Sequence, residues 1–343
     1  MNSNQLKGVI IGTGFFAQFQ VEAWMRVAGV TITAVTDAVP ERAEQFAAQW
    51  GIPNVYGNAA TMLAAEQPDF VDIITRPDTH LELTQLAAQH GAHVICQKPM
   101  APTWEDGLQM IALCRQAGVR LLIHENWRWQ AWYREIKRLL EDEWLGHLFY
   151  LGFHSRLGDG RGVEPYTAQP YFREMPQLLV YETAVHFLDT FRFLAGEIES
   201  IYCTTQRINP VIRGEDAALI HTTFVSGVSG LIDANRISGP MPSPPAFGTL
   251  TVEGERGSLR LTPSGDLFIT AYHQDEQLHE YKKPQIGYKS DSVKAAQEHY
   301  ANCLLTGQPC ESEGEFYLPT VRAVQACYQS AAQQQVIKLE NEL

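Results

Sequence analysis

One glycine-containing stretch near the N-terminus, residues 9–17, limits what this chain can fold into. Its first three residues are apolar, as in a short buried strand, and Gly12 then allows a sharp turn. Gly14 and Ala17 complete the pattern Gly-x-Gly-x-x-Ala, in which small residues let the backbone approach a bulky anion and let the next helix pack on the strand. The N–H groups that open this helix, expected over residues 17–27, suit a pyrophosphate.

A second predicted strand, residues 30–36, supplies the context that this pattern needs. It ends at Asp37, whose carboxylate can accept both hydroxyls of an adenosine ribose and would repel a 2′-phosphate. The alternative is a glycine turn in an ordinary strand–helix unit. The order of strand, helix, strand and carboxylate favours a dinucleotide site, so we predict NAD rather than NADP. The predicted contacts include Phe15 and Phe16 in the turn, and Arg42, which could swing toward the ribose.

The length, composition and net charge of the chain narrow the class of protein. A length of 343 residues favours two domains, and 45% hydrophobic with 19% charged residues is typical of a globular chain. The net charge of −13 argues against nucleic acid and anionic membrane surfaces as partners. The six cysteines contain no C-x-x-C pair, and the polar residues 1–7 lack the apolar centre of a signal peptide. We expect a cytoplasmic protein with reduced, mostly buried thiols.

The first part of the chain alternates strands and helices, which predicts a parallel, doubly wound sheet. Further strands are expected over 55–56, 70–74, 93–96 and 119–123, and further helices over 40–50, 58–66, 79–89 and 103–117. Ligands of such sheets lie at the carboxyl ends of the strands. The polar residues there include Thr75, Pro77 and Gln97, which we predict as cofactor contacts. His80 is a further candidate, although it could equally pack at the start of its helix.

The pattern changes after residue 126. A helix over 132–142, a strand over 148–153, a long loop over 155–176 and a helix over 178–194 precede six β-type runs between residues 201 and 272. Helices over 293–305 and 313–334 end the chain. The expected fold is α/β, with a Rossmann dinucleotide-binding domain of residues 1–126. A second α/β domain of residues 127–343 would carry a large open, mostly antiparallel sheet.

Lys98 follows a predicted strand end and precedes Pro99, which restricts the backbone there. A partly desolvated lysine beside a nicotinamide can donate to a hydroxyl that is being oxidised and help to move its proton. An ordinary surface lysine at a strand end explains the same pattern.

Glu182 and His186 lie four residues apart in the predicted helix, and Asp189 follows three residues later. A carboxylate beside an imidazole can orient it as a general base. A helix-surface pair of small energetic value is the alternative. Glutamate and histidine are also metal ligands, but no further cluster with ligand spacing accompanies them, so we expect no metal site.

The tract Trp127-Arg128-Trp129, preceded by Asn126, is dense in indole and polar groups. Indole rings stack on the C–H faces of sugars while amide and guanidinium groups bind hydroxyls. An aromatic seam between the two domains explains the tract as well, and both interpretations can hold. Arg156, Arg161 and Tyr166 in the long loop are weaker candidates for substrate binding.

Taken in order, these pieces resemble the Gfo/Idh/MocA oxidoreductases over essentially the whole chain. The Lys98-Pro99 dipeptide after a strand, together with the distant helix of His186, is the most specific part. The resemblance implies a Rossmann domain, a substrate-binding and oligomerisation domain, and oxidation of a sugar or polyol hydroxyl with a nicotinamide cofactor. It implies a homodimer or homotetramer built through the large sheet. Lys98 matches the family's motif lysine and His186 its catalytic histidine.

Two residues depart from the family pattern. Gln97 stands where the family usually has glutamate, which predicts an altered site that still hydrogen-bonds near the nicotinamide ribose. Glu182 replaces a frequent aspartate and is one methylene longer, which leaves its exact role open. The tract around Trp127 is similar to that of dehydrogenases acting on branched pentoses such as D-apiose.

Two other functions are compatible with the same resemblance. One is a glycosidase that holds NAD tightly and uses oxidation, elimination and reduction. The other is a regulator that senses dinucleotides without catalysis. The presence of Lys98 and His186 argues against the regulator, and the polar N-terminal residues argue mildly against a secreted glycosidase. An NAD-dependent sugar or polyol dehydrogenase therefore remains the leading hypothesis.

Overall fold

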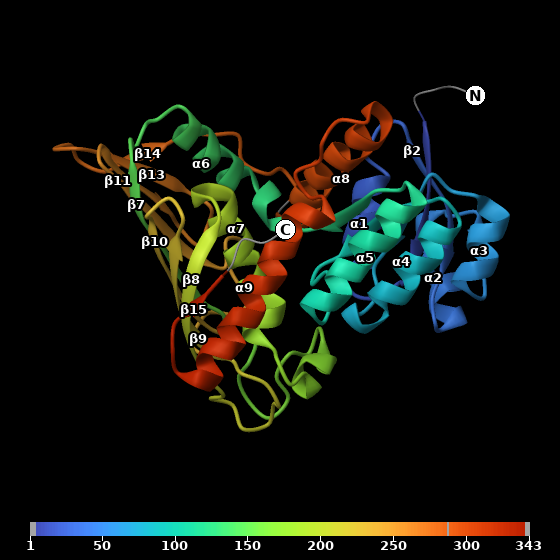
Figure 1. Ribbon diagram of the computed structural model, residues 1–343, viewed down its shortest axis with the longest axis horizontal. Helices are drawn as coiled ribbons and strands as arrows, with labels where there is room; N and C mark the ends of the chain where they lie inside the picture. Colours follow the sequence, from blue (N-terminus) through green and yellow to red (C-terminus); the bar gives the residue numbers. More distant parts are fainter. Residues whose placement is uncertain (1–4, 287, 340–343) are drawn as a thin grey trace. The chain divides into compact units, whose positions relative to one another are not determined.

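The computed structural model describes residues 5–286 and 288–339, and these form two compact units (Figure 1). Unit 1 comprises the described parts of Met1–Trp129 and Lys289–Val321, and unit 2 the described parts of Gln130–Tyr288 and Arg322–Leu343. The sequence predicted two domains separated by a single boundary after residue 126. The units of the structure differ from these domains because residues 289–321, expected in the second domain, belong to unit 1.

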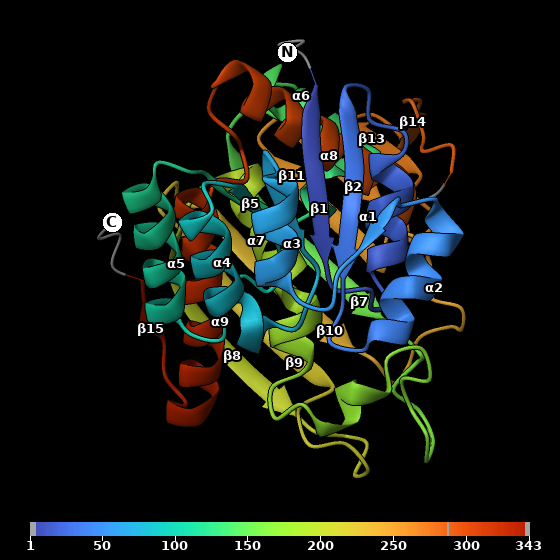
Figure 2. The same ribbon diagram turned by 90° about the vertical axis from the view of Figure 1, so that its right-hand side faces the viewer.

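Unit 1 contains a parallel sheet of six strands in its described residues, ordered β3-β2-β1-β4-β5-β6. This is the doubly wound Rossmann order, as predicted. Figure 2 shows β1 and β2 side by side. The strands are β1 Leu6–Ile11, β2 Val30–Thr36, β3 Asn54–Val55, β4 Phe70–Ile73, β5 His93–Gln97 and β6 Leu121–His124.

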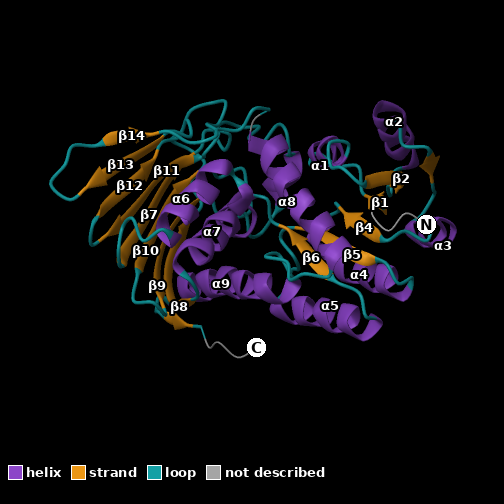
Figure 3. Cartoon of the chain, turned by 90° about the horizontal axis from the view of Figure 1, so that it is seen from above, coloured by secondary structure: helices purple, strands orange, loops and turns teal. Residues whose placement is uncertain are grey.

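Helices cover both faces of this sheet. Figure 3 shows α1, α2 and α8 on one face and α3, α4 and α5 on the other. The helices are α1 Ala17–Trp24, α2 Pro40–Trp50, α3 Ala59–Glu66, α4 His80–Gln89, α5 Trp104–Ala117 and α8 Tyr288–Thr306, with 3₁₀ helices over Pro77–Thr79 and Trp127–Trp129.

Local sequence explains several of these boundaries. Asn58 accepts the main-chain N–H of Thr61 at 2.9 Å and so caps α3, and Thr103 caps α5 in the same way through Asp106 at 3.1 Å. Helix α1 ends at Trp24, three residues before the predicted end. Helix α8 joins unit 1 because Ala296 and Tyr300 are fully buried in the same core as Ile10 of β1.

Unit 2 contains a mixed sheet, with nine strands among its described residues. The order is β14-β13-β12-β11-β7-β10-β9-β8-β15, and all neighbours are antiparallel except β7 and β10. The predicted large, mostly antiparallel sheet is confirmed, although β14 and β15 were not expected. The strands are β7 Leu148–Arg156, β8 Ile198–Gln206, β9 Ala217–Phe224, β10 Ser229–Asn235, β11 Gly248–Gly254, β12 Gly257–Leu261, β13 Leu267–Ala271, β14 Gln277–His279 and β15 Ile337–Lys338.

Helices α6 (Ala131–Glu141) and α7 (Val185–Ala195) lie on one face of this sheet (Figure 3). Phe187 of α7 packs on Phe153 of β7, with ring centroids 4.3 Å apart. Side chains alternate along each strand, and on the other face Leu219 and Tyr202 remain exposed. Helix α9 comprises Gly314–Gln333; its residues up to Val321 belong to unit 1, and those from Arg322 onward belong to unit 2.

The helix predicted over 178–194 is only partly an α-helix. Leu179–Ala184 form a π-helix, and α7 follows directly from it. Because a π-helix has a wider turn than an α-helix, the spacing of Glu182 and His186 does not give the single α-helical face expected from the sequence. A short 3₁₀ helix, Pro170–Glu174, interrupts the predicted long loop.

All six cysteines are buried and free, which confirms the expectation of buried thiols. Across the described residues, every helix is too short or too polar to cross a membrane.

Candidate active site

The glycine turn lies where the strand order of unit 1 reverses, between β1 and β4. Gly12 has a φ of +98°, and a Cβ on it would lie 2.6 Å from the carbonyl oxygen of Ile74. Any other residue there would be both strained and in collision with the end of β4. Gly14 differs, because it is exposed and a Cβ on it would meet no protein atom within 4 Å. The backbone at Gly14 is therefore open to a ligand, while Gly12 is required by the fold.

Asp37 is held against this turn. Its Oδ2 accepts the main-chain N–H of Thr13 at 2.7 Å and the Thr13 hydroxyl at 2.8 Å. Its Oδ1 accepts the N–H of Val39 at 2.9 Å. These bonds orient the carboxylate at the carboxyl end of β2, and the carboxylate retains acceptor capacity for the hydroxyls of a ligand.

These features fit a dinucleotide. A Rossmann site needs an open turn for the phosphates at the switch point of the sheet, and the exposed backbone at Gly14 and the buried Ala17 at the start of α1 meet this need. It also needs an acceptor for the ribose hydroxyls, and the oriented carboxylate of Asp37 meets that need. Thr75 and Pro77 follow β4, and the Thr75 hydroxyl lies 2.7 Å from that of Thr79. Arg42 is exposed in the first turn of α2.

Lys289 lies beside the same turn and was missed by the sequence analysis. Its ammonium lies 5.0 Å from the ring centroid of Phe15 and 4.9 Å from that of Phe19. Burial lowers the pKa of Lys289, and the two rings provide a cation–π environment for the charge. The predicted contact Phe16 packs on His124, with ring centroids 6.4 Å apart. A lysine so far along the chain from the turn gives no local signal in the sequence.

A buried chain of hydrogen bonds begins behind Lys98. The main-chain N–H of Lys98 donates to Gln97 Oε1 at 2.7 Å, and the Gln97 amide donates to Gln20 Oε1 at 2.6 Å. The Gln20 amide donates to both carboxylate oxygens of Asp72, at 2.8 and 2.9 Å. The indole N–H of Trp24 donates to Asp72 at 2.7 Å. The chain fixes the backbone that carries Lys98, and the neutral amide of Gln97 suits its place because it both donates and accepts.

Asp72 is the acidic end of this chain. It is fully buried in β4, and this burial raises the pKa of its carboxyl group to about 7, against the lowering effect of the bonds from Trp24 and Gln20. The sequence alone predicts only a strand at this position.

His80 is fully buried and connects two loops. Its Nδ1 lies 3.1 Å from the carbonyl oxygen of Met100 and its Nε2 lies 3.2 Å from that of Thr75. Burial lowers the pKa of His80, and this outweighs the hydrogen bonds with the carbonyl oxygens of Met100 and Thr75, which raise it. The predicted cofactor contact is thus a side chain that fixes Thr75, and not one exposed to a ligand.

The aromatic tract lies inside unit 1. Trp127, Arg128 and Trp129 are 2%, 9% and 8% exposed. Asn126 donates to the Ser292 hydroxyl at 2.8 Å, and Trp129 packs on the imidazole of His299 with ring centroids 4.7 Å apart. Of the two interpretations of this tract, packing accounts for Trp129.

In unit 2, His186 and Asp189 are 8% and 0% exposed on α7, and Glu182 lies half-buried in the preceding π-helix. Glu215 anchors the start of this segment. Its carboxylate accepts the N–H of Val180 at 2.9 Å and the hydroxyl of Tyr328 at 2.6 Å.

Arg236, which the sequence analysis did not single out, lies near two of the predicted residues. It is ion-paired to Asp159 and donates to the Thr183 hydroxyl at 2.7 Å. Its guanidinium lies 4.9 Å from the ring centroid of Tyr166. Burial lowers the pKa of Arg236. The charge and hydrogen bond of Asp159, and then the charges of Tyr166 and Glu182, raise this pKa by more, so the net change is an increase. The only available signal was a charged residue directly after a strand.

Arg156 is placed elsewhere. Its guanidinium donates to the Asp233 carboxylate at 2.6 Å, and both side chains alternate with the buried Ser155 and Ala234. They therefore lie on the face of the sheet away from α7, so the structure does not bring Arg156 together with His186. Arg161 is exposed and donates to the carbonyl of Ile237.

Comparison with known protein families agrees with this description. A family model described as an oxidoreductase family with an NAD-binding Rossmann fold matches residues 6–125. A second model, for the GFO/IDH/MocA C-terminal domain, matches residues 133–260. The chain belongs to the Gfo/Idh/MocA oxidoreductase family.

Relatives in this family match over the full length. A D-apiose dehydrogenase of Rhizobium rhizogenes is 34% identical over 340 residues, covering 97% of this chain and 97% of the relative. A second D-apiose dehydrogenase, from Paraburkholderia graminis, is 34% identical over 345 residues, covering 98% and 90%.

A solved structure of an oxidoreductase from Agrobacterium radiobacter, in complex with NAD⁺, L-tartaric acid and magnesium, superposes with a TM-score of 0.90. Its sequence is 32% identical to this one, and the match covers 97% of this chain and 98% of the chain in that structure. As a Gfo/Idh/MocA member, this protein is an NAD-binding oxidoreductase, which the geometry of the glycine turn and Asp37 supports.

Proposed function

We propose that this protein is an NAD-dependent dehydrogenase that oxidises a hydroxyl of a sugar or polyol, with a branched aldose such as D-apiose as the first substrate to test. The similarity to two D-apiose dehydrogenases over nearly the whole chain carries the choice of substrate. Asp37, oriented by Thr13 at the carboxyl end of β2, supports NAD over NADP because a carboxylate at this position of a Rossmann site would repel a 2′-phosphate.

In this proposal the coenzyme residues come from unit 1. Gly12, Gly14 and Ala17 form the turn for the pyrophosphate, and Asp37 accepts the hydroxyls of the adenosine ribose. Phe15, Phe16 and Thr75 border the same edge of the sheet, and Gln97 donates or accepts near the nicotinamide ribose. Arg42, exposed in the first turn of α2, would have to turn toward the ribose to offset the charge of Asp37.

The chemistry requires removal of a hydride and a proton from one CH–OH group. Bound NAD supplies the hydride acceptor. Lys98 donates a hydrogen bond to the reacting hydroxyl and stabilises negative charge that develops on its oxygen. His186 accepts the hydroxyl proton, and Glu182, whose charge is near enough to Arg236 to raise the pKa of its guanidinium, orients the substrate. Asn126, Arg128 and Tyr166 remain candidates for substrate binding.

We also propose that the protein forms a homodimer or homotetramer through the open face of the large sheet. Leu219 is 50% exposed and Leu231 is 36% exposed on adjacent strands of that face. Exposed apolar side chains on a broad sheet are typical of a surface that a second copy covers. The six free, buried cysteines are in keeping with a reducing compartment, for which we propose the cytoplasm.

A substrate screen tests the proposed activity. The purified protein is incubated with NAD and single aldoses or polyols, D-apiose included, and NADH absorbance is followed. Net NADH formation with a free sugar supports the dehydrogenase. Cleavage of a glycoside without net NADH would instead support the glycosidase, and no turnover with any sugar would support the regulator.

A further inference from the structure

Two cysteines and a histidine lie together at the end of α8, outside the glycine turn and its contacts. Cys303 and Cys310 are each 1% exposed, and His299 is half-buried. One ligand atom from each of the three residues lies within 4.8 Å of the other two, and within the described residues no other group of histidine, cysteine or acidic side chains is gathered in this way.

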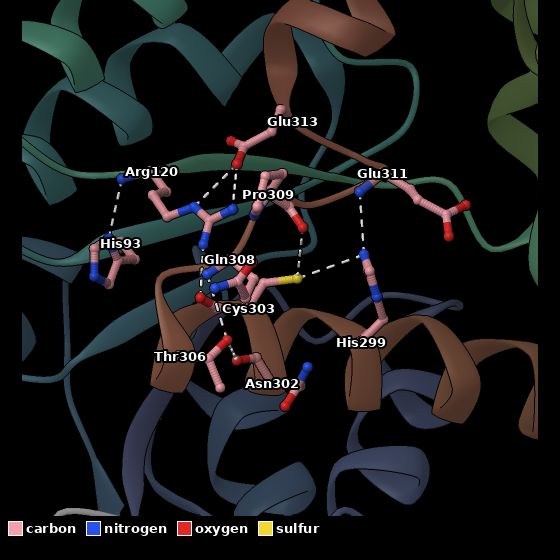
Figure 4. Close-up of polar contacts among 10 residues, drawn as sticks. All are labelled: His93, Arg120, His299, Asn302, Cys303, Thr306, Gln308, Pro309, Glu311 and Glu313. Atoms are coloured by element: carbon pink, nitrogen blue, oxygen red, sulfur yellow. Dashed lines mark hydrogen bonds and ion pairs between the residues drawn. The ribbon is translucent and has the colours of Figure 1, made fainter.

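The local structure explains why the three residues meet. His299 and Cys303 are four residues apart on α8, so they share one face of the helix. The chain then turns, and Cys310 comes back to the same place. The ring of His299 is fixed by packing on Trp129. Arg120 holds the end of the helix, because its guanidinium donates to the carbonyl of Cys303 at 2.7 Å and pairs with Glu313 (Figure 4).

The distances suit a thiophilic cation. His299 Nε2 lies 3.5 Å from Cys303 Sγ (Figure 4). A tetrahedral zinc ion, with Zn–S bonds of about 2.3 Å and Zn–N bonds of about 2.0–2.1 Å, separates a sulfur and a nitrogen ligand by about 3.5 Å. His299 Nε2 also accepts the N–H of Glu311 at 3.1 Å, so Nε2 carries the lone pair and the proton is on Nδ1.

We propose that His299, Cys303 and Cys310 form a binding site for a thiophilic metal ion of the Zn²⁺ class, with water as the fourth ligand on the half-buried side of His299. Binding converts two thiols to thiolates and releases two protons, and His299 binds through Nε2 as the neutral imidazole. On metal binding, the lone pair of His299 Nε2 gives up its hydrogen bond with the Glu311 N–H and coordinates the metal ion.

Burial raises the pKa of both the Cys303 and the Cys310 thiol, so the two side chains are neutral thiols while the cluster is empty. A cation in the cluster would compensate two thiolates directly, and cysteine with histidine is the ligand set that Zn²⁺ and Cu⁺ prefer. The site would tie α8 to the loop that leads into α9, so its role is structural and independent of the proposed dehydrogenase reaction.

The test uses the full-length protein, reduced and then freed of metal by a chelator. Co²⁺ alone is titrated first, because two thiolate ligands produce a charge-transfer band in the near ultraviolet and tetrahedral Co²⁺ produces intense visible bands. Zn²⁺ is then titrated against a chromophoric chelator. We expect one equivalent of either metal, and a higher Tm with Zn²⁺ than without it.

Three variants identify the ligands. Cys303→Ser and Cys310→Ser are expected to abolish the charge-transfer band or weaken it to that of one thiolate. They should also reduce Zn²⁺ affinity at least about 100-fold, since even outer-shell changes cost about 10- to 100-fold. His299→Gln, at a half-buried position, tests the site in a variant with little risk of misfolding. Cys114→Ser, a buried thiol of α5 outside the cluster, should bind Co²⁺ as the parent does.

Two results would overturn the proposal. One is the absence of the Co²⁺ charge-transfer band in the reduced parent. The other is an unchanged band and Zn²⁺ affinity in both cysteine variants, provided that NAD binding shows each variant to be folded.

Discussion

Thr13 and Asp37 connect the glycine turn to the end of the second strand. The N–H and the hydroxyl of Thr13 both donate to one carboxylate oxygen of Asp37, at 2.7 and 2.8 Å. Two donors on the same oxygen hold the carboxylate in one orientation, so its charge is fixed in place before a coenzyme binds. The proposed preference for NAD over NADP would then depend on a charge that cannot easily move away.

Asp37→Ala is expected to relax this preference. Removing the carboxylate eliminates the repulsion of a 2′-phosphate and the acceptors for the ribose hydroxyls, so kcat/KM with NAD should fall and kcat/KM with NADP should rise. The measurement is kcat/KM with both coenzymes for the parent and the variant. Thr13→Val, which removes one of the two donors, should change the ratio less. A parent enzyme that already uses NADP as well as NAD would contradict the assignment.

Gly12 and Gly14 should respond differently to substitution. Gly14→Val adds a side chain where no protein atom lies within 4 Å, so Tm should stay near that of the parent while NAD affinity falls. Gly12→Ala forces a Cβ toward the Ile74 carbonyl at 2.6 Å in a left-handed conformation, so both Tm and NAD affinity should fall. Calorimetric titration of NAD and thermal unfolding separate the two cases. Unchanged NAD affinity in Gly14→Val would show that the coenzyme does not approach there.

Lys98→Ala is expected to keep NAD binding and lose most turnover. General acid–base and electrostatic assistance to the reacting hydroxyl contributes about two to four orders of magnitude in rate. The measurement is kcat with the best substrate from the screen, together with the Kd of NAD. Lys294→Ala, which changes a lysine paired with Glu298 on α8, serves as the control. Turnover within threefold of the parent would assign Lys98 a structural role.

Asp72 should make stability depend on pH. Its folded-state pKa of about 7 lies above the ordinary value of 3.8, so between these values the folded protein holds a proton that the unfolded chain has lost. The stabilising contribution is complete below the unfolded value and is lost as pH rises to about 7. Between pH 5 and pH 8 the resulting decrease in the free energy of unfolding is about 2.5 kcal/mol.

Urea unfolding at these two pH values, for the parent and for Asp72→Asn, measures the effect. The variant has no titrating group at this position, so its free energy of unfolding should fall less between pH 5 and pH 8 than that of the parent. Its absolute stability is expected to be lower, because an amide in place of the carboxyl group cannot accept from all the donors of Gln20 and Trp24. Equal pH slopes would show that Asp72 is ionised throughout.

His186→Asn tests the proposed proton acceptor. A protonated imidazole cannot accept the hydroxyl proton, so kcat/KM of the parent for sugar oxidation should fall on the acid side, while the reverse reaction tolerates acid better. The asparagine variant keeps a hydrogen-bonding group, so it should lose this acid limb and have a lower plateau. The measurement is the pH profile of kcat/KM in both directions. A variant with the acid limb and rate of the parent would point to Lys98 as the base.

Local pattern determined much of this protein. The glycine turn, Asp37 and the alternating strands and helices predicted the parallel sheet, because each depends on residues close together in the chain. Strand β2 and helix α2 lie at the predicted residues 30–36 and 40–50. The β-type runs after residue 200, which follow one another without an intervening helix, likewise predicted a mostly antiparallel sheet, whose strands β14 and β15 were too short to give a pattern.

The tertiary structure decided what depends on distant residues. Helix α8 packs on the sheet of unit 1 because its apolar face meets a core formed by residues far earlier in the chain, which no local period records. The buried chain from Asp72 to Lys98, the place of Arg236 between Tyr166 and Thr183, and the π-helical turn around Glu182 arise in the same way. Hydrogen bonds and ion pairs of buried groups form between whichever partners the fold brings together, so sequence spacing identifies the groups but not their partners.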